Sequence, residues 1–336
     1  MAVTIYDIAR EAGVSPSTVS LVMNNSRKIR ASTAAHVREV ADRLGYAPNF
    51  AARSLANSQT YNIGVILPNL SNPCFSTTLQ EIVRTAGDLG YGVVLGLSDQ
   101  SIDKEKQYID MLSEQRVDGI LIMPSFLDKV FPEFIKGKND ANIPMILCGA
   151  STTQSQNIGY VKCDNHMGGY VATEHLIQTG KRRIACLCAV AERTQAASRV
   201  AGYRDAHEFY GVPCLPELIA FCAPDNDVIR RETARLITEQ QVDAFFCLFD
   251  YMCLPVISVI QELGKRIPED VAIVGYDNID ISSTLPIPLT SVDTHMRQIG
   301  AMAVNQLIKK IEDPEREPRR IILKPELVVR ASSEVR

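Results

Sequence analysis

Few of the side chains that usually perform catalysis stand at a spacing that would let them act together. The sequence contains no HExxH, GxSxG or P-loop motif, and Gly90-Tyr-Gly92 followed by Gly96 has the wrong spacing for a dinucleotide fingerprint. None of the five histidines shows metal-ligand spacing: His36, His166, His175, His207 and His295. We therefore expect no catalytic residue, no metal and no cofactor, although turnover of a candidate ligand would revive an enzymatic role.

The cysteines predict the same absence of reactive chemistry. There are nine, an odd number, and none forms a CxxC pair. Cys186 and Cys188 stand two residues apart on a predicted strand and therefore share one of its faces. We interpret them as core thiols rather than metal ligands or a disulfide. Unpaired core cysteines of this kind are typical of proteins in a reducing cytoplasm. Charged residues near the start, such as Asp7 and Arg10, argue against a signal peptide, and no apolar run reaches the ~18 residues that would predict a membrane span.

The side chains with the clearest chemical potential lie near the start of a predicted short helix. Pro16, Ser17, Ser20 and Leu21 would face outward there, where they could meet base edges in a DNA major groove. Residues 1–60 carry seven basic and four acidic side chains, a net charge of +3, whereas the whole chain carries −4. This asymmetry favours a polyanionic partner for the basic end. The alternative is a generic three-helix bundle.

Three short helices are predicted to position these side chains. Apolar stripes appear at Ile5–Ala12, Val19–Met23 and Val37–Leu44. Thr4 and Asp7 form a capping pair for the first helix, and Gly13 ends it. Ser15 can cap the second helix, with Pro16 in its first turn. The gap of about three residues between these helices is typical of a helix-turn-helix unit.

A fourth helical segment follows at residues 50–56, after Pro48 and the capping residue Asn49. At about two turns it is shorter than the ~12–15 residues that a lone helix needs for stability. We therefore interpret it as a conditional hinge helix that forms when something packs on it.

From Asn62 onward, predicted buried strands alternate with amphipathic helices. Strands are expected at 63–67, 92–97, 119–123, 144–148, 184–189, 218–221, 244–248 and 271–276, with helices at 79–89, 104–116, 169–179, 200–210, 227–240 and 255–263. A final strand is expected at 321–330. The repeated order predicts an α/β fold with two doubly wound parallel sheets, in which a ligand would bind between the two units at the strand carboxyl ends.

A series of motifs resembles the LacI/GalR family of bacterial repressors. The run TIYDIAREAGVSPSTVSLVMN, from Thr4 to Asn24, is similar to the family's DNA-binding signature. Gly45–Asn49 and Ala52–Ala56 resemble its hinge. The resemblance continues, in order along the chain, through Asn72–Phe75, Val117–Ile120, Asp164–Asn165, Gly168–Gly169, Glu174–Leu176, Lys181–Ile184, Arg199–Tyr203, Val274–Asp277 and Pro288–Thr290.

The resemblance implies a division of the chain into a three-helix helix-turn-helix head, a hinge and a periplasmic-binding-protein-like sensor. The expected boundaries are 1–47 for the head, 48–60 for the hinge helix and linker, and 61–336 for the sensor. Within the sensor, the first subdomain would comprise 61–161 and 293–320, and the second 162–292 and 321–332.

The resemblance also implies a dimeric repressor on a near-palindromic operator, with one head on each half-site. The expected DNA contacts are Thr4, Ser15, Pro16, Ser17, Thr18, Ser20, Leu21, Asn24, Asn49, Ala52 and Leu55. Leu21 replaces the arginine common at its position, so the usual guanine contact should be missing. Leu55 falls where the family inserts a leucine wedge into the minor groove; the alternative is an ordinary leucine on a helix face.

The resemblance places a small-molecule effector in the cleft of the sensor, with contacts from Phe75, Asp164, Arg199, Phe249, Asp250 and Asp277. Arg199 and Asp277 would face each other across the cleft and clamp hydroxyl groups. Phe249 replaces the usual asparagine, a loss for which Tyr251 could compensate, and the chain has no tryptophan to stack on a sugar. Asp164 could instead cap the following helix. A sugar or sugar derivative is expected, with other small polar metabolites open.

The remaining expectations concern assembly and rival functions. The family's dimer faces would include the helix after Phe75 and the region 251–263. Only six residues follow the last expected strand, so no heptad tail is available for a tetramer. A periplasmic sugar binder with the same sensor fold is the main rival, and the head argues against it. The sequence leaves open the effector's identity and whether the effector releases or strengthens DNA binding. It also leaves open the operator and target genes, whether the protein represses or activates transcription, and whether a protein partner binds the sensor.

Overall fold

The computed structural model of the chain describes residues 3–23, 29–46, 59–124, 134, 137, 143–151, 158–189, 193–223 and 225–334. The chain forms two compact units, Met1–Thr60 and Tyr61–Arg336. The division falls at the end of the expected linker. Most of the predicted hinge, including Asn49, Ala52 and Leu55, lies outside the described residues.

The first unit is the predicted helix-turn-helix head. Its helices are α1 (Ile5–Ala12), α2 (Pro16–Met23) and α3 (Ala31–Arg43). The predicted capping box is confirmed: Asp7 N donates to Thr4 Oγ1, and Thr4 N donates to Asp7 Oδ2 at 3.0 Å. Gly13 ends α1 with a φ of 65°, a left-handed conformation that favours glycine. Ile8, Val19, Val22, Val37 and Val40 are buried where the three helices meet.

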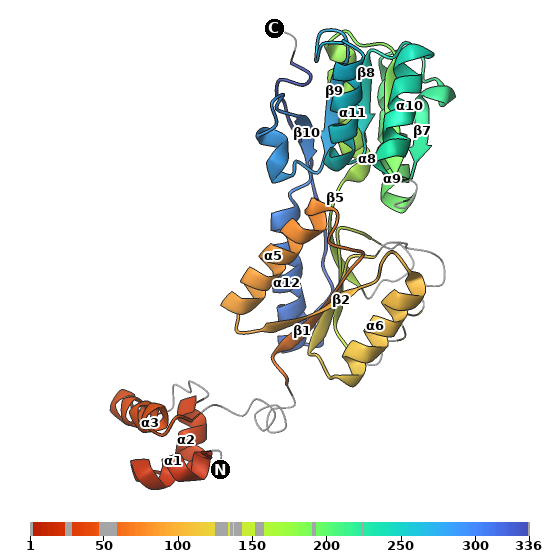
Figure 1. Cartoon of the computed structure of the whole chain (residues 1–336). Coiled ribbons are helices and arrows are strands. Elements are labelled where there is room, and N and C mark those ends of the chain that lie inside the picture. The colour runs from red at the N-terminus through yellow and green to blue at the C-terminus, as the bar shows by residue number, and fades with distance from the viewer. Residues whose placement is uncertain are drawn as a thin grey trace. The chain divides into compact units, whose positions relative to one another are not determined.

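The second unit contains two six-stranded sheets, as expected for an α/β sensor. In the first sheet all strands are parallel, in the order β11 (Arg320–Leu323), β5 (Gly159–Cys163), β4 (Met145–Cys148), β3 (Gly119–Ile122), β1 (Asn62–Leu67) and β2 (Gly92–Leu97). Helices α5 (Pro73–Asp88) and α12 (Met296–Glu312) cover one face, and α6 (Ile102–Glu114) covers the other (Figure 1). The alternation along β1 matches this layering, since Ile63 and Val65 pack with α5 and α12 whereas Ile66 packs with α6.

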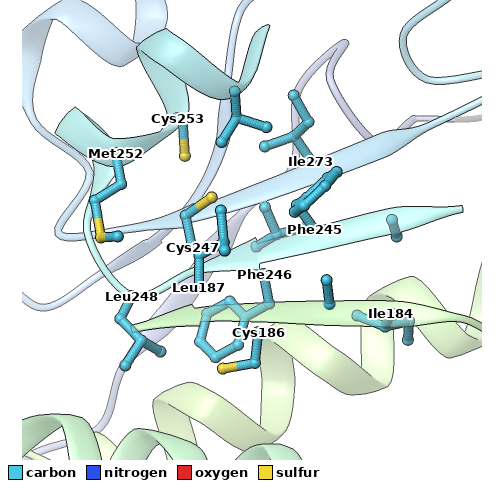
Figure 2. Close-up of a cluster of buried hydrophobic side chains, with 14 of the residues drawn as sticks. Ile184, Cys186, Leu187, Phe245, Phe246, Cys247, Leu248, Met252, Cys253 and Ile273 are labelled. Carbon is cyan, nitrogen blue, oxygen red and sulfur yellow. The ribbon is translucent and has the colours of Figure 1, made fainter. Parts of the chain in front are cut away.

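The second sheet has the order β12 (Glu326–Val328), β10 (Thr290–Asp293), β9 (Ala272–Tyr276), β8 (Ala244–Cys247), β6 (Ile184–Ala189) and β7 (Ile219–Cys222). Among the described strands of this sheet, β12 alone is antiparallel to its neighbour. The helices that accompany this sheet are α8 (Asn165–Gln178), α9 (Arg193–Phe209), α10 (Asn226–Thr238) and α11 (Asp250–Glu262), with short 3₁₀ turns η1 (Pro216–Leu218) and η2 (Asp280–Ser283). Its core contains Phe245, Phe246, Leu248 and Ile273 (Figure 2).

The cysteines behave as predicted core thiols. All nine are described and unbridged, and eight are buried. The Sγ atoms of Cys186 and Cys188 lie 3.7 Å apart on one face of β6. Burial raises the pKa of Cys148 to about 12, so that thiol stays protonated and unreactive near neutral pH.

Helices α8 and α9 approach so closely that two positions require glycine. A Cβ at Gly169 would overlap the Arg199 carbonyl oxygen, and one at Gly202 would overlap the His166 carbonyl oxygen. Backbone cannot move aside as a flexible side chain can. These glycines therefore fix the position of α9, which carries Arg199.

The chain passes between the two subdomains three times, and the last crossing corrects one expectation. The first two crossings lie between β5 and α8 and between β10 and α12. The predicted single strand 321–330 is in fact two strands, with β11 in the first sheet and β12 in the second. The expected assignment of 321–332 to the second subdomain is therefore wrong for β11. The break falls at Pro325, which has no N–H to donate to a strand ladder. Among the described residues, no helix is both long and apolar enough to cross a bilayer.

Candidate functional site

The exposed face of α2 carries the residues predicted to read DNA. Val19 and Val22 are buried, whereas Ser17 is exposed and Leu21 is 38% exposed on the opposite side. Pro16, Thr18 and Ser20 are half-buried. This face is therefore sterically available for base contacts, which stay a prediction.

Two of the predicted DNA contacts already have a structural role. Ser15 Oγ accepts a hydrogen bond from Thr18 N at 3.1 Å and lies 2.9 Å from Thr18 Oγ1, so Ser15 caps α2 as predicted. Thr4 Oγ1 donates to Asp7 Oδ2 at 2.7 Å, and hydrogen bonds from Thr4 hold the pKa of Asp7 below its ordinary value. The predicted contact Asn24 lies outside the described residues, as do the three hinge residues.

A cleft between the two subdomains of the second unit gathers four of the six predicted effector residues. We call it the effector cleft; its cavity volume is about 20 Å³, so it is nearly closed in this conformation. Phe75, Arg199, Phe249 and Asp277 line it, and Asp164 and Asp250 do not. The other lining residues are Asn72, Cys74, Met123, Gly149, Cys163, Asn165, Thr294 and Met296.

Arg199 is a buried charge in the cleft, and only 4% of its side chain is exposed. Its guanidinium carbon lies 3.6 Å from the centre of the Tyr276 ring and 4.7 Å from that of Phe249. Nε donates to Asn165 Oδ1 at 2.9 Å, and Nη1 donates to the Leu248 carbonyl oxygen. The two aromatic faces and the hydrogen bonds stabilise the buried cation and fix the direction of its remaining donors.

Asp277 completes a charge pair with Arg199, but not in the expected geometry. Nη2 of Arg199 lies 3.6 Å from Asp277 Oδ1. Arg199 belongs to α9 and Asp277 follows β9, so both lie in the second subdomain and on one wall of the cleft. The expectation that they face each other across the cleft is therefore wrong. The pair forms within one subdomain because both residues stand at the carboxyl-end side of the same sheet.

Two cleft residues that sequence reasoning missed carry unpartnered polar atoms. Asn72 Nδ2 and Thr294 Oγ1 are buried and have no hydrogen-bond partner among the described residues. Asn72 is 5% exposed and Thr294 is 2% exposed. Asn72 Oδ1 caps α5 by accepting from Cys74 N at 3.0 Å, which turns the Nδ2 group away from the helix. An unpaired buried polar group costs about 1–3 kcal/mol, so both atoms favour a ligand that pairs with them.

Asp250 points away from the cleft and into the second subdomain. Its carboxylate accepts hydrogen bonds from Ile279 N (2.9 Å), Ser282 Oγ (2.7 Å) and Ser291 Oγ (2.6 Å). Gly275 leaves room for it, since a Cβ there would overlap Asp250 Oδ1. Burial raises its pKa from 3.8 to about 6, although the three hydrogen bonds oppose the shift. The effector contact predicted for Asp250 has no counterpart in this geometry.

The remaining predicted contacts have partly structural roles. Asp164 Oδ1 accepts from Met167 N at 3.1 Å and caps α8, which is the alternative that the sequence left open. Tyr251 stacks on Phe249, with ring centres 5.6 Å apart, on a ring that also contacts Arg199. The Phe249 ring therefore already contacts both Tyr251 and Arg199 in this conformation. Burial raises the pKa of the Cys163 thiol at the cleft to about 12, so it stays protonated and is a poor nucleophile.

The head and the two-sheet unit together define a class: a DNA-binding regulator with a sensor unit in the same chain. Comparison with known proteins gives the family. Residues 4–49 match bacterial regulatory proteins of the lacI family, and residues 173–333 match a periplasmic binding protein-like domain. The HTH-type transcriptional repressors PurR of Aliivibrio fischeri and Photobacterium profundum are 34% and 32% identical to the chain, each with 98% of both sequences covered.

Two solved structures are also similar to the chain over nearly its whole length. A lac repressor dimer bound to operator and the anti-inducer ONPF is 26% identical, with a TM-score of 0.87 and 100% of both chains covered. A complex of the regulator CelR with cellobiose is 28% identical, with a TM-score of 0.73, covering 98% of this chain and 99% of that one. The chain belongs to the LacI family and is a DNA-binding transcriptional repressor rather than an enzyme, which confirms the family resemblance and the predicted class.

Proposed function

We propose that the protein represses transcription in the cytoplasm as a homodimer on a near-palindromic operator, and that a small polar effector in the effector cleft sets its affinity for DNA. Each head would place α2 in the major groove of one half-site. The hinge helices, with Leu55 as a wedge, would order on DNA and kink its centre. Effector binding would change the relation of the two subdomains and so the stability of the hinge.

The observation that carries this proposal is the pair of unpartnered atoms, Asn72 Nδ2 and Thr294 Oγ1. Asn72 belongs to the first subdomain, whereas Arg199 and Asp277 line the wall formed by the second. A ligand that accepts from Asn72 and also meets Arg199 or Asp277 would tie the two subdomains together. Its binding free energy would then depend on the angle between them, which is what allosteric coupling requires.

The lining favours an uncharged, polar ligand of modest size. Arg199 and Asp277 offer a donor and an acceptor side by side, and the pair has little net charge to attract an ion. Two ligand classes have specific support. The name of the PurR relatives points to a purine-related effector, and the cellobiose complex of CelR points to a sugar, the class expected from sequence. Purine bases and sugars both present the ring-edge donors and acceptors that this wall could pair.

The test is a binding panel on the whole protein. Isothermal titration with adenine, guanine and hypoxanthine, and with glucose and cellobiose, should identify one class that binds. Asn72→Asp keeps the cap of α5 but removes the Nδ2 donor, and Thr294→Val removes the hydroxyl at nearly constant volume. Each should weaken binding by roughly 10-fold, whereas Thr238→Val, on the far helix α10, should not. Unchanged affinity in both cleft variants would contradict this site.

Operator binding is tested separately. Selection from a random duplex pool at a stated salt concentration should enrich a near-palindrome with a central pyrimidine–purine step. Adding the effector should change the operator Kd by about 5–150-fold, the usual range of allosteric coupling. Sedimentation should show a dimer; a stable tetramer would contradict the assembly proposed.

A further inference from the structure

A second, larger cavity lies in the first subdomain of the sensor, away from the effector cleft. We call it the basic cavity; its volume is about 290 Å³. Its walls come from the carboxyl-terminal half of α12, the segment 316–319 that leads into β11, and the first residues of β4 and β11. No residue lining it also lines the effector cleft.

The position of the basic cavity follows from the topology of the parallel sheet. Met145 is the first residue of β4 and Ile321 the second of β11, so the cavity lies at the amino end of the strands. The effector cleft lies at the opposite end, where Gly149 follows β4 and Cys163 ends β5. Helix α12 runs along the sheet between them (Figure 1). It lines the cleft with Met296 and the basic cavity with Lys309.

One part of the lining is apolar. Met145 and Ile146 come from β4, Met302 from α12 and Ile321 from β11. Met145 and Ile146 are buried in the sheet, and Met302 and Ile321 are half-buried. Ile146 packs on the α12 side of the sheet whereas Met145 packs on the α6 side, so Ile146, Met302 and Ile321 form the apolar wall. The Met302 side chain is flexible and polarizable, so it adapts to ligands of irregular shape. This wall could bind an apolar group of modest size.

The other part of the lining is cationic. Lys309, Arg316 and Arg319 line the cavity, and no described carboxylate forms an ion pair with any of them. Lys310 is different, because its Nζ donates to the Pro314 and Arg316 carbonyl oxygens and holds the segment in place. Glu317 is the single acidic residue among the described residues of the lining.

The acids nearby in sequence, Glu312, Asp313 and Glu315, do not line the cavity. The lining therefore keeps an excess of positive charge. A further donor also belongs to it, since Gln306 Nε2 is buried and has no partner among the described residues. The lining thus combines an apolar wall with several donors and cations that lack an anionic partner.

From this combination we propose that the basic cavity is a second ligand site, which takes a small anion with an apolar group: a phosphate ester or a carboxylate. Arginine guanidinium groups bind phosphate and carboxylate oxygens in bidentate geometry, and Lys309 adds a mobile point charge. The apolar group would pack on Ile146 and Met302. The cavity volume of about 290 Å³ lies at the lower limit of ordinary small-molecule sites, roughly 300–1,000 Å³. The site is distinct from the effector cleft, so its existence does not depend on the proposed effector.

The test uses the full-length protein and phenyl phosphate as the probe. Isothermal titration at constant low salt should show binding of phenyl phosphate, weaker binding of inorganic phosphate, and no binding of benzyl alcohol. A carboxylate probe, 4-phenylbutyrate, separates the two ligand sources: equal binding assigns the site to apolar anions in general, and weaker binding assigns it to phosphate esters. Both results support the proposal.

Three variants locate the site. Arg316→Gln combined with Arg319→Gln should weaken phenyl phosphate binding by roughly 10-fold or more. Asn305→Trp, at an exposed lining position on α12, should block the cavity without disturbing the fold, as thermal melting would verify. Lys324→Gln, an exposed lysine outside the lining, should bind as the parent does. Inorganic phosphate binding as tightly as phenyl phosphate, or full affinity in the double variant or in Asn305→Trp, would overturn the proposal.

Discussion

The raised pKa of the buried Asp250 carboxyl can be tested directly, because one substitution removes the charge of this side chain and keeps its shape. Asp250→Asn mimics the protonated carboxyl. Its amide oxygen can accept from Ile279 N and Ser282 Oγ, as Oδ2 does now, and its amide nitrogen can donate to the Ser291 hydroxyl oxygen. We therefore expect the variant to keep the fold and to lose the pH dependence that ionisation of Asp250 causes.

The sign and size follow from the pKa. The folded value, about 6, lies above the ordinary 3.8, so the folded state holds the proton more tightly than the unfolded chain. Stability then falls as pH rises from about 4 through 6, since ionising the buried carboxyl costs free energy in the folded state alone. The full penalty is about 3 kcal/mol, and about half of it develops between pH 5 and pH 8.

The assay is urea unfolding of parent and variant between pH 5 and pH 8, followed by circular dichroism. Relative to Asp250→Asn, the free energy of unfolding of the parent should fall by about 1.4 kcal/mol over this range. Asp250→Ala should be destabilised at every pH, because it leaves the Ile279 N–H and two serine hydroxyls without an acceptor. A constant difference between parent and Asp250→Asn would refute the raised pKa.

Three further predictions concern packing and DNA. Gly202→Ala should destabilise the sensor by about 3 kcal/mol or more, since its Cβ would meet the His166 carbonyl oxygen. Gly87→Ala, with open space around it on α5, should be neutral or stabilising by up to about 1 kcal/mol. Denaturant titration of the two variants compares their free energies of unfolding. Leu55→Ala should weaken binding to the selected operator more than to random duplex in a gel-shift titration, and equal loss on both would remove the wedge role. Leu21→Arg should shift the selected half-site toward guanine at one position, and an unchanged selection would show that this side chain does not reach a base edge.

Local sequence signals predicted most of the elements. The capping pair Thr4–Asp7, Gly13 and the cap Ser15 act within three residues of the backbone groups that they satisfy, so neighbouring residues suffice to place the head helices. The strands of both sheets were predictable because buried parallel strands are short apolar runs between helices. The exception is the region around Pro325, where the apolar residues continue but the sheet changes. The proline was the available signal for that break.

The site was less predictable because burial and pairing are tertiary properties. Asp250 and Asp277 both stand near strand ends in the sequence, yet Asp277 lines the cleft and Asp250 points inward. What separates them is space at Gly275 and donors from Ile279, Ser282 and Ser291, which lie 29 to 41 residues further along the chain. Asn72 and Thr294 were missed for a related reason. Their signal is the absence of a partner, which a sequence does not display.

The placement of Arg199 and Asp277 on one wall changes how an effector would act. If the two charges stood on opposite walls of the cleft, they would attract each other even without ligand. Their attraction would then favour closure of the empty protein. Here the pair is formed within the second subdomain, together with Tyr276 and Phe249, and gains little from closure. Asn72 Nδ2 and Thr294 Oγ1 instead have no hydrogen-bond partner in the part of the chain that the structure describes, so a ligand could pair with them. Asn72→Asp should therefore reduce the effect of ligand on operator affinity more than it changes operator affinity without ligand, because the residue contributes to coupling only when a ligand bridges it to the opposite wall.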